Sequence, residues 1–229
     1  QLMAYQANMG TREFEDYFYR VTTEVDYQAM SVAMEKAKAF LDKADRVEIK
    51  AVGTDLSFSI KGMGAIPCAG RKNIPDGEIY SCPVKESVNG RITYNTASTY
   101  NGHCFTDVSF TIKEGRIVEA SADDTEALHK VLDTDAGARY FGEFALGCNP
   151  EITFAMDNIL FDEKIAGSIH FTPGNAYEEC DNGNRSAVHW DLVQIQTPQY
   201  GGGTIHIDGE LIRKDGLFVH PAFTDLNFA

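Results

Sequence analysis

The amino-acid sequence predicts an α+β fold: a strand-rich body of largely antiparallel or mixed sheet with flanking helices, preceded by a short helical segment. Two observations support this fold class. From about residue 46 onward, apolar and polar residues alternate in many short runs, as in half-buried strands. Between residues 12 and 46, apolar residues instead recur at the i, i+3, i+4 spacing of one buried helical face. The members of that face are Met30, Ala33, Met34, Ala37 and Leu41.

Glycine-containing turns divide the strand-rich part. Alternation is clearest in "RVEIKAV", "TDLSFSI", "DVSFTI" and "TIHIDGELI", and the turns are "VNGR", "KEGR" and "IDGE". One helix interrupts the strands, in "DDTEALHKVLDT". Asp123 or Asp124 can cap the start of this helix, and Leu128, Val131 and Leu132 can face a core.

Composition and charge limit the classes of function. The 229 residues include 20 Lys and Arg against 34 Asp and Glu, which gives a net charge of −14. This acidic excess argues against a nucleic-acid partner, because nucleic-acid binding relies on clustered basic residues, and it suits cation binding. No apolar run approaches the roughly 20 residues of a membrane span, and the first residues lack a signal-peptide pattern, so we expect a cytoplasmic protein without a membrane partner.

The stretch "RSAVHWDLV" contains a candidate half-site for a metal ion. If it is a strand, His189 and Asp191 share one face, and Trp190 lies on the other face with its apolar neighbours. An imidazole and a carboxylate side by side suit a divalent cation. The alternative is a hydrogen-bonded surface pair. Further ligands are needed from elsewhere in the chain.

Three other segments place a carboxylate or imidazole among glycine, proline and apolar residues. They are "NIPDGEIYSCP" with Glu78, "YFGEFALGCNP" with Glu143 and "GSIHFTPGNAY" with His170. Burying Glu143 between a glycine and a phenylalanine is costly unless a cation neutralises it. The alternatives are an Arg139–Glu143 ion pair and, for His170, a hydrogen-bonded core histidine.

The order and wording of several stretches resemble one family. The stretches are "GTDLSFSI", "NIPDGEIYSCP", "SVNGRITYN", "GARYFGEFALGCNP", "LFDEKIAGSIHF", "GNAY" and "NRSAVHWDLV". Together they resemble the catalytic domain of the M29 aminopeptidases, a thermophilic family of dinuclear metallo-exopeptidases. The resemblance runs from about residue 50 to the end of the chain without large gaps.

The resemblance implies a site for two divalent metal ions, with zinc, cobalt, manganese or magnesium as candidates. Glu143 matches the carboxylate that bridges both ions, and His189 and Asp191 match the closing pair, one for each ion. Tyr177 matches a tyrosine that acts on the reacting carbonyl. The complete ligand set implied is Glu78, Glu143, His170, His189 and Asp191.

The same resemblance sets the expected activity and organisation. It implies a metal-dependent aminopeptidase that removes N-terminal amino acids from peptides with a free N-terminus, through a metal-activated water, and that forms a homodimer. Glu143 or Glu78 is the candidate to accept the proton of the water. We expect residues 1–45 to be the helical tail of a missing N-terminal domain and residues 46–229 to be the dinuclear catalytic domain.

Other interpretations remain open from the residues alone. A mononuclear iron oxygenase could use His189, Asp191 and His220 as a facial triad, but it leaves the remaining candidates without a role. A non-catalytic module could bind metal or peptide, or dimerise. His206 alternates with Asp208, which is better explained as a turn residue. The remaining histidines, His103 and His129, are not assigned to a site, and Cys82 and Cys104 form no evident Cys–His constellation for a thiol protease.

Overall fold

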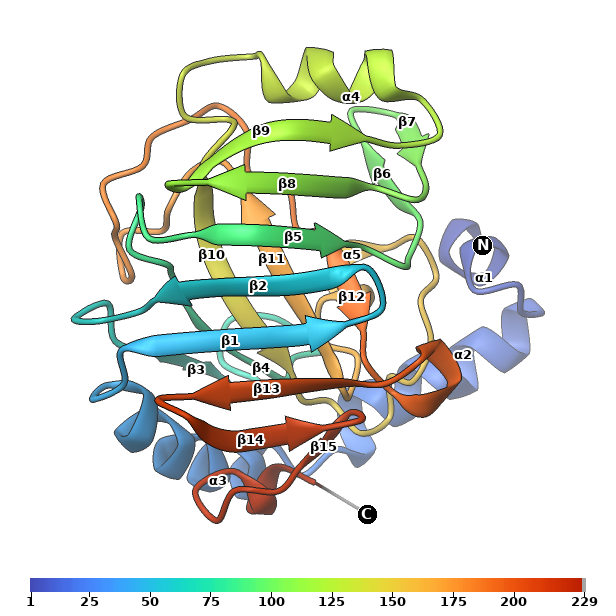
Figure 1. Ribbon diagram of the computed structural model, residues 1–229. Coiled ribbons are helices and arrows are strands. Elements are labelled where there is room, and N and C mark those ends of the chain that lie inside the picture. Colours follow the sequence, from blue (N-terminus) through green and yellow to red (C-terminus); the bar gives the residue numbers. More distant parts are fainter. Residues whose placement is uncertain (228–229) are drawn as a thin grey trace.

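Two antiparallel sheets form the framework of this computed structural model, which describes residues 1–227. The larger sheet has eight strands in the order β15-β14-β13-β1-β2-β5-β8-β9. In Figure 1 the five-stranded sheet lies behind it, with its strands crossing those in front. The strands of the larger sheet are β1 (Arg46–Ala51), β2 (Thr54–Ser59), β5 (Asn89–Thr93), β8 (Ser109–Lys113), β9 (Arg116–Ser121), β13 (Gly203–Ile207), β14 (Glu210–Lys214) and β15 (Leu217–Phe218).

The smaller sheet has the order β12-β11-β10-β4-β3, and a separate hairpin joins β6 to β7. All paired strands of the smaller sheet are antiparallel. The fold therefore matches the predicted α+β class, and the four alternating segments quoted above form strands. The strands of the smaller sheet are β3 (Ile66–Cys68), β4 (Glu78–Ser81), β10 (Phe141–Gly147), β11 (Ser168–Pro173) and β12 (Val193–Ile195). The separate hairpin consists of β6 (Ser98–Tyr100) and β7 (His103–Phe105).

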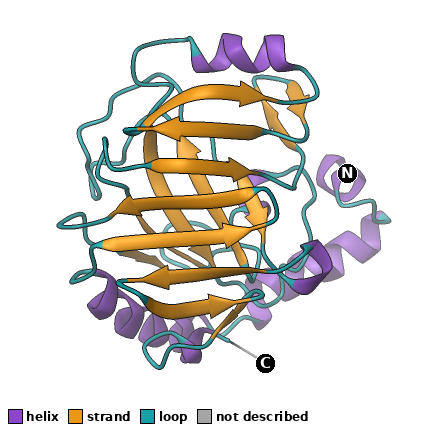
Figure 2. Cartoon of the chain, viewed as in Figure 1, coloured by secondary structure: helices purple, strands orange, loops and turns teal. Residues whose placement is uncertain are grey.

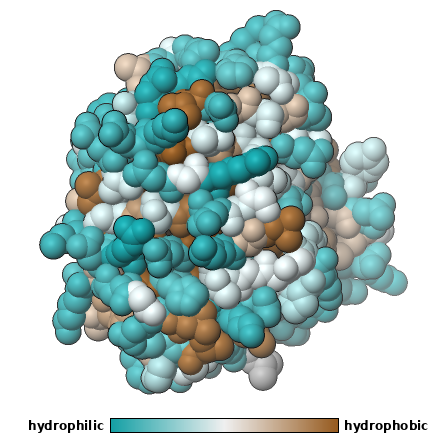
Figure 3. All heavy atoms as spheres, viewed as in Figure 1, coloured by the Kyte–Doolittle hydropathy of each residue, from teal (hydrophilic) through white to brown (hydrophobic). Residues whose placement is uncertain are grey.

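Aromatic side chains fill the space between the two sheets. The ring of Phe58, on β2, lies 5.0 Å from the rings of Phe144 and Phe171, on β10 and β11. Phe141 adds a contact with Phe171 at 4.3 Å. These residues are almost fully buried, as expected for positions that alternate with outward-facing residues along each strand. The outer face of the larger sheet carries mostly hydrophilic and neutral side chains with separate apolar patches (Figure 3).

Most helices, including α3 and α4, lie at the margins of the sheets, whereas α5 lies behind the larger sheet (Figure 1 and Figure 2). The predicted apolar face of α3 is buried against the main core, and the side chain of Asp124 caps α4 through the N–H of Ala127. Both predictions are confirmed. No helix among the described residues has the length and apolar character needed to cross a membrane. The helical elements are α1 (Leu2–Gln6), α2 (Thr11–Tyr19), η1 (Arg20–Glu24), α3 (Tyr27–Leu41), α4 (Thr125–Leu132), α5 (Ile159–Asp162), η2 (Pro198–Tyr200) and η3 (Thr224–Leu226).

Helical structure between residues 12 and 46 is not continuous, which corrects one expectation. A π-helical turn, η1, follows α2, and the chain is extended at Val25 before α3 starts at Tyr27. The hydroxyl groups of Thr22 and Thr23 donate to the carbonyls of Phe18 and Tyr19, a back-bonding that bends helices. The break lets the two parts of the segment pack against different cores.

Candidate metal centre

Strand alternation places three of the predicted ligands on one face of the smaller sheet. Residues such as Phe144 and Phe171 point into the core between the sheets. Because side chains alternate along a strand, their neighbours Glu143 and His170 point to the opposite face. Glu78, at the start of β4, lies on the same side, next to β10. Three adjacent strands, β4, β10 and β11, thus hold these side chains on a rigid frame.

Glu78, Glu143 and His170 form the first of two groups with metal-ligand spacing. The Nε2 atom of His170 lies 3.2 Å from Oε2 of Glu78 and 3.2 Å from Oε1 of Glu143. All three side chains are buried. One ligand atom from each lies within 4.8 Å of the others, which is compact enough to surround a single cation.

The second group contains Glu143 again, together with His189 and Asp191. The Nε2 atom of His189 lies 3.3 Å from Oε2 of Glu143 and 3.3 Å from Oδ1 of Asp191. The hydroxyl of Thr172 donates to Oδ1 of Asp191 at 2.7 Å and fixes that carboxylate. Each oxygen of Glu143 therefore faces a different imidazole. The structure brings all five predicted ligands together.

The hydrogen bonds of His189 leave one ring nitrogen free to bind a cation. Its Nδ1 lies 2.8 Å from the carbonyl oxygen of Asn175, which can only accept, so Nδ1 carries the proton. In the neutral ring Nε2 then presents a lone pair to the acidic cluster. Both Nε2 of His189 and Oε2 of Glu78 are buried without a hydrogen-bond partner. Buried polar atoms of this kind, with three carboxylates and two imidazoles as donors, fit a pair of divalent cations.

The protonation of the cluster reflects its concentration of negative charge. Burial lowers the pKa of His170, but the hydrogen bond with Glu143 and the charge of Glu78 outweigh burial and raise it to about 10. Burial is likewise outweighed at His189, where the neighbouring carboxylates of Asp191 and Glu143, each 3.3 Å from Nε2, raise the pKa to about 11. Burial and the charge of Glu163 raise the pKa of Glu78 well above its usual value. The metal-free cluster therefore retains protons, which a dication would displace.

The stretch "RSAVHWDLV" is extended but is not a regular strand, contrary to the expectation. His189 forms an isolated bridge with Gly174, and β12 begins only at Val193. The predicted alternation nevertheless holds, because Trp190 is buried opposite the site. Its ring stacks on Tyr100 at 5.0 Å, and its Nε1 donates to the hydroxyl of Ser98. Packing of Trp190 and backbone hydrogen bonds to β11 hold this segment in place: the N–H of Trp190 donates to the carbonyl of Pro173, and the N–H of Phe171 donates to the carbonyl of Leu192.

Two alternative roles considered for the candidate residues are wrong. Arg139 does not pair with Glu143; it contacts Asp133 at 2.6 Å and His129 at 2.9 Å. The i, i+4 spacing that suggested an Arg139–Glu143 pair brings side chains together only on a helix, and Glu143 lies on a strand.

The iron triad with His220 is also contradicted. His220 lies against Phe40 and contacts Glu210, on β14 of the other sheet, at 3.0 Å. It belongs to none of the metal-type groups found among residues 1–227. Asp208 accepts bonds from the backbone of Asp45 and Arg46, which confirms its turn role.

Tyr177 lies at the opening of the site. Its ring is 4.6 Å from the ring of His189 and 5.6 Å from that of Tyr80, and its side chain is partly exposed. Tyr177 also lines a cavity of about 300 Å³ whose walls include Glu78, Glu143 and Asp191. A small molecule or the end of a peptide can therefore reach the carboxylate cluster from the side of Tyr177.

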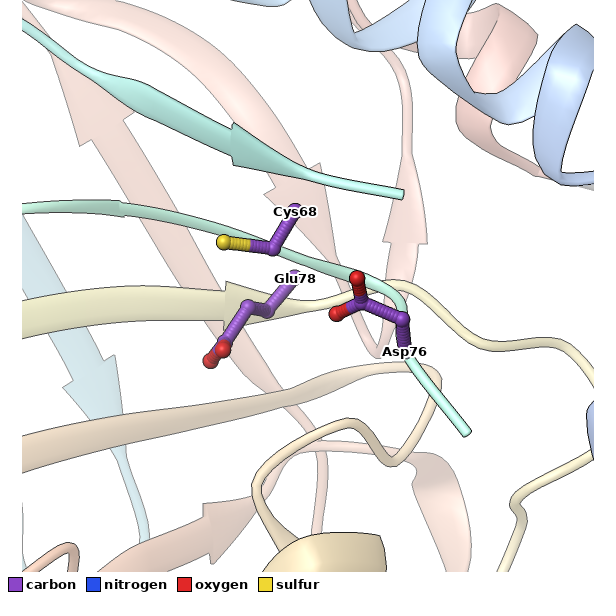
Figure 4. Close-up of side chains that lie close together, drawn as sticks. All are labelled: Cys68, Asp76 and Glu78. Atoms are coloured by element: carbon purple, nitrogen blue, oxygen red, sulfur yellow. The ribbon is translucent and has the colours of Figure 1, made fainter. Parts of the chain in front are cut away.

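Sequence reasoning missed two features of this site. The first is a buried group formed by Cys68, Asp76 and Glu78, shown in Figure 4. The Asp76 carboxylate accepts from the backbone N–H of Gly70 at 2.6 Å and of Gly77 at 3.0 Å, and so holds the turn that precedes Glu78. Burial raises the pKa of the Cys68 thiol far above its usual range, which keeps it protonated. This group supports the position of Glu78.

The second missed feature is Glu163, which lines the cavity beside the predicted ligands. It lies just after α5, and its carboxylate is paired with the fully buried ammonium of Lys164. The only signal in the sequence is an adjacent acid and base in "LFDEKIAG", a combination that is common on surfaces.

The site is a cluster of metal-type ligands, and comparison with known families identifies the class of protein that carries it. The model of the thermophilic metalloprotease family M29 matches residues 18–218, so the chain belongs to that family.

Among individual relatives, aminopeptidase 2 of Geobacillus stearothermophilus is 34% identical over 171 residues, which cover 69% of this chain and 40% of the relative. Aminopeptidase T of Thermus thermophilus is 29% identical over 218 residues, 83% of this chain and 51% of the relative. The chain thus spans about half the length, or less, of these relatives.

Solved structures share the fold. Wild-type AmpT from Thermus thermophilus superposes with a TM-score of 0.72 and 26% identity, over 91% of this chain and 58% of the other. The 2,5-dihydroxypyridine dioxygenase of Pseudomonas putida KT2440 also gives a TM-score of 0.72, but with 16% identity, over 91% of this chain and 64% of the other. The second likeness concerns the fold alone, and one fold can host different reactions.

Proposed function

We propose that this protein is a metal-dependent aminopeptidase that removes N-terminal amino acids from peptides by two-metal activation of water. One observation carries the proposal: both oxygens of Glu143 are engaged, one facing His170 and the other facing His189. A carboxylate between two ligand groups is what a dinuclear centre requires. The chain belongs to a metalloprotease family and has relatives named aminopeptidases, which supports the same function.

The five ligands divide into two sets in this proposal. Glu78 and His170 would hold one ion and His189 and Asp191 the other, with Glu143 shared between the two sets. The donors are oxygen and nitrogen, which suits zinc, cobalt, manganese or magnesium. Two dications bound there would polarise the peptide carbonyl and lower the pKa of a water molecule to near neutrality.

Residues around the ligands orient them and act on the substrate. The carbonyl of Asn175 fixes the tautomer of His189, and the hydroxyl of Thr172 fixes Asp191. The phenol of Tyr177, at the opening of the cavity, is placed to donate a hydrogen bond to the carbonyl oxygen as negative charge develops on it. Glu143 or Glu78 is the candidate to take the proton of the attacking water.

Metal analysis combined with two activity assays tests the proposal. Two divalent ions per chain and release of an N-terminal residue from a short peptide are expected, and an N-acetylated copy of the same peptide should be left intact. One iron per chain with oxygen consumption on an aromatic substrate would favour an oxygenase. Metal binding without turnover of either substrate would favour the non-catalytic module.

We also propose the organisation implied by the family. Residues 1–45 would end an N-terminal domain and residues 46–229 would form the catalytic domain, which is consistent with relatives about twice as long as this chain. Partly exposed apolar side chains on α1 and α2, including Tyr5 and Tyr19, are available for contact with such a domain or with a second copy in a homodimer. Light scattering of the full-length protein tests the dimer, and a monomer at micromolar concentration would contradict it.

A further inference from the structure

A carboxylate outside the ligand set faces the cavity above the metal centre. Glu163 lines this cavity of about 300 Å³, and its side chain is 13% exposed. Among residues 1–227 it belongs to neither of the two groups that share Glu143. The negative charge of Glu163 nevertheless helps to raise the pKa of Glu78. Glu163 is therefore close to the reaction site without being one of the proposed ligands.

Lys164 orients this carboxylate and favours its charged form. The Lys164 side chain is fully buried, and its Nζ forms an ion pair with Oε1 of Glu163. Burial raises the pKa of Glu163, and the adjacent charge of Lys164 opposes that rise. Only Oε1 takes part in this ion pair. The second oxygen of a carboxylate held on one side retains the capacity to accept a hydrogen bond.

The proposed substrate needs a partner of this kind. A peptide with a free N-terminus brings an ammonium group to within a few bonds of the peptide carbonyl that reacts. The three ligand carboxylates balance only three of the four positive charges of two dications, so an ammonium beside them is repelled. A further carboxylate that faces the cavity offsets that repulsion locally, although the pair with Lys164 is neutral as a whole, and it adds a charge-assisted hydrogen bond.

We propose that Glu163 binds the α-ammonium group of the substrate and so restricts the enzyme to unblocked N-termini. This inference rests on the proposed aminopeptidase function. Glu179 also lines the cavity, but its side chain is 52% exposed and already pairs with Lys72 at 2.8 Å. Exposed ion pairs are screened by water and contribute little, which makes Glu179 the weaker partner.

Steady-state kinetics of Glu163→Gln test the proposal. Loss of a hydrogen bond between charged groups typically costs about 10- to 100-fold in binding. We expect KM for leucyl-p-nitroanilide to rise by that factor with kcat nearly unchanged, because the ammonium is held equally in the ground state and the transition state. Glu126→Gln is the matched control, since Glu126 forms an exposed ion pair with Lys130 on α4. It should leave both constants unchanged.

A substrate without the amine separates ammonium binding from other effects. 4-Methylpentanoyl-p-nitroanilide, which lacks only the amino group, should be a poor substrate for the unaltered enzyme. Glu163→Gln should not weaken its hydrolysis further. Metal content should stay at the level of the unaltered protein.

A second variant guards against misfolding. Glu163→Gln leaves the ammonium of Lys164 buried without its counter-ion, which is destabilising, whereas Glu163→Gln with Lys164→Met removes both charges together. The double variant should show the same selective rise in KM for the amine substrate.

Several results would overturn the inference. Equal losses on both anilides, a fall in kcat with KM unchanged, or a loss of metal in Glu163→Gln would each assign another role to Glu163. If the unaltered protein hydrolyses no aminoacyl substrate, the aminopeptidase function itself fails. If it is active and Glu163→Gln matches it on both anilides, only the inference about Glu163 fails.

Discussion

The Nε2 atom of His189 lies 3.3 Å from Oε2 of Glu143, the oxygen that points away from His170. The His189 ring is fixed by the hydrogen bond from its Nδ1 to the carbonyl of Asn175, so its Nε2 points toward that oxygen. Glu143 therefore has one oxygen in each ligand group. The dinuclear interpretation depends on this arrangement, and the predictions below test its parts.

Removing one histidine should remove one metal ion. We expect His189→Ala and His170→Ala each to lower the divalent-metal content from two ions per chain to one, because each substitution dismantles a single ligand group. Atomic emission of protein dialysed against a fixed free-metal buffer measures the content. His220→Ala is the control, since His220 contacts Glu210 outside both groups, and it should retain both ions. Loss of both ions from either variant would show that the two groups do not bind independently.

Tyr177→Phe should slow catalysis and leave the metal centre intact. The side chain is partly exposed and contacts the ring of His189, but it belongs to neither ligand group. Loss of one hydrogen-bond donor to a developing oxyanion typically lowers kcat by about 10²- to 10³-fold. Rapid-quench or steady-state rates with parallel metal analysis check this. A Tyr177→Phe enzyme with unchanged kcat would remove Tyr177 from the mechanism.

The sequence carried enough information for the ligand positions but not for their surroundings. Glu143 and His170 are implied as ligands by the resemblance of their motifs to a family, and the structure places both on the face of the smaller sheet opposite the core. The role of Glu163 depends on the burial of Lys164 beneath it, and burial of a Glu–Lys pair is a tertiary property that two adjacent charged letters do not reveal. Likewise, no glycine or proline marks the helix break at residues 20–26, which involves back-bonding threonines.

The same distinction explains the errors. His189 and Asp191 alternate with Trp190 as in a strand, and the backbone of Trp190 and Leu192 is hydrogen-bonded to that of Pro173 and Phe171, yet the regular strand β12 begins only at Val193. Alternation indicates which side chains are buried, and an extended segment that pairs irregularly produces the same pattern as a regular strand. The alternative of an Arg139–Glu143 ion pair rested on sequence spacing, and that spacing has meaning only within a helix.

Stability of the metal-free protein should depend on pH through Asp162. Burial and the charge of Asp157 raise its pKa from 3.8 to about 7, although it accepts bonds from the backbone of Met156 and Asn158. The folded state therefore binds the proton more tightly than the unfolded state. This tighter proton binding adds to the free energy of unfolding. The added stability is fully present below the unfolded pKa of about 4 and is lost as pH rises through about 7. The change is about 4 kcal/mol, at 1.36 kcal/mol per pKa unit.

Asp162→Asn should flatten this dependence because the amide does not titrate. Urea unfolding of the unaltered and variant proteins, with a chelator present at several pH values between about 4 and 7, measures the difference in slope. Asp225→Asn serves as the control, since Asp225 is half-exposed in a pair with Lys36. Parallel stability curves for the Asp162→Asn and unaltered proteins would show that Asp162 does not titrate in this window.

The central claim, that Glu143 bridges two metal ions, is tested most directly by metal analysis of purified Glu143→Gln. The amide removes the negative charge that lets two dications lie close together in a buried site, where their mutual repulsion is poorly screened. Circular dichroism should confirm that the variant is folded, and Glu126→Gln should carry the same metal as the unaltered protein. We predict that Glu143→Gln loses at least one of the two ions and all measurable peptide hydrolysis. Two ions per chain in the folded variant would contradict the dinuclear account.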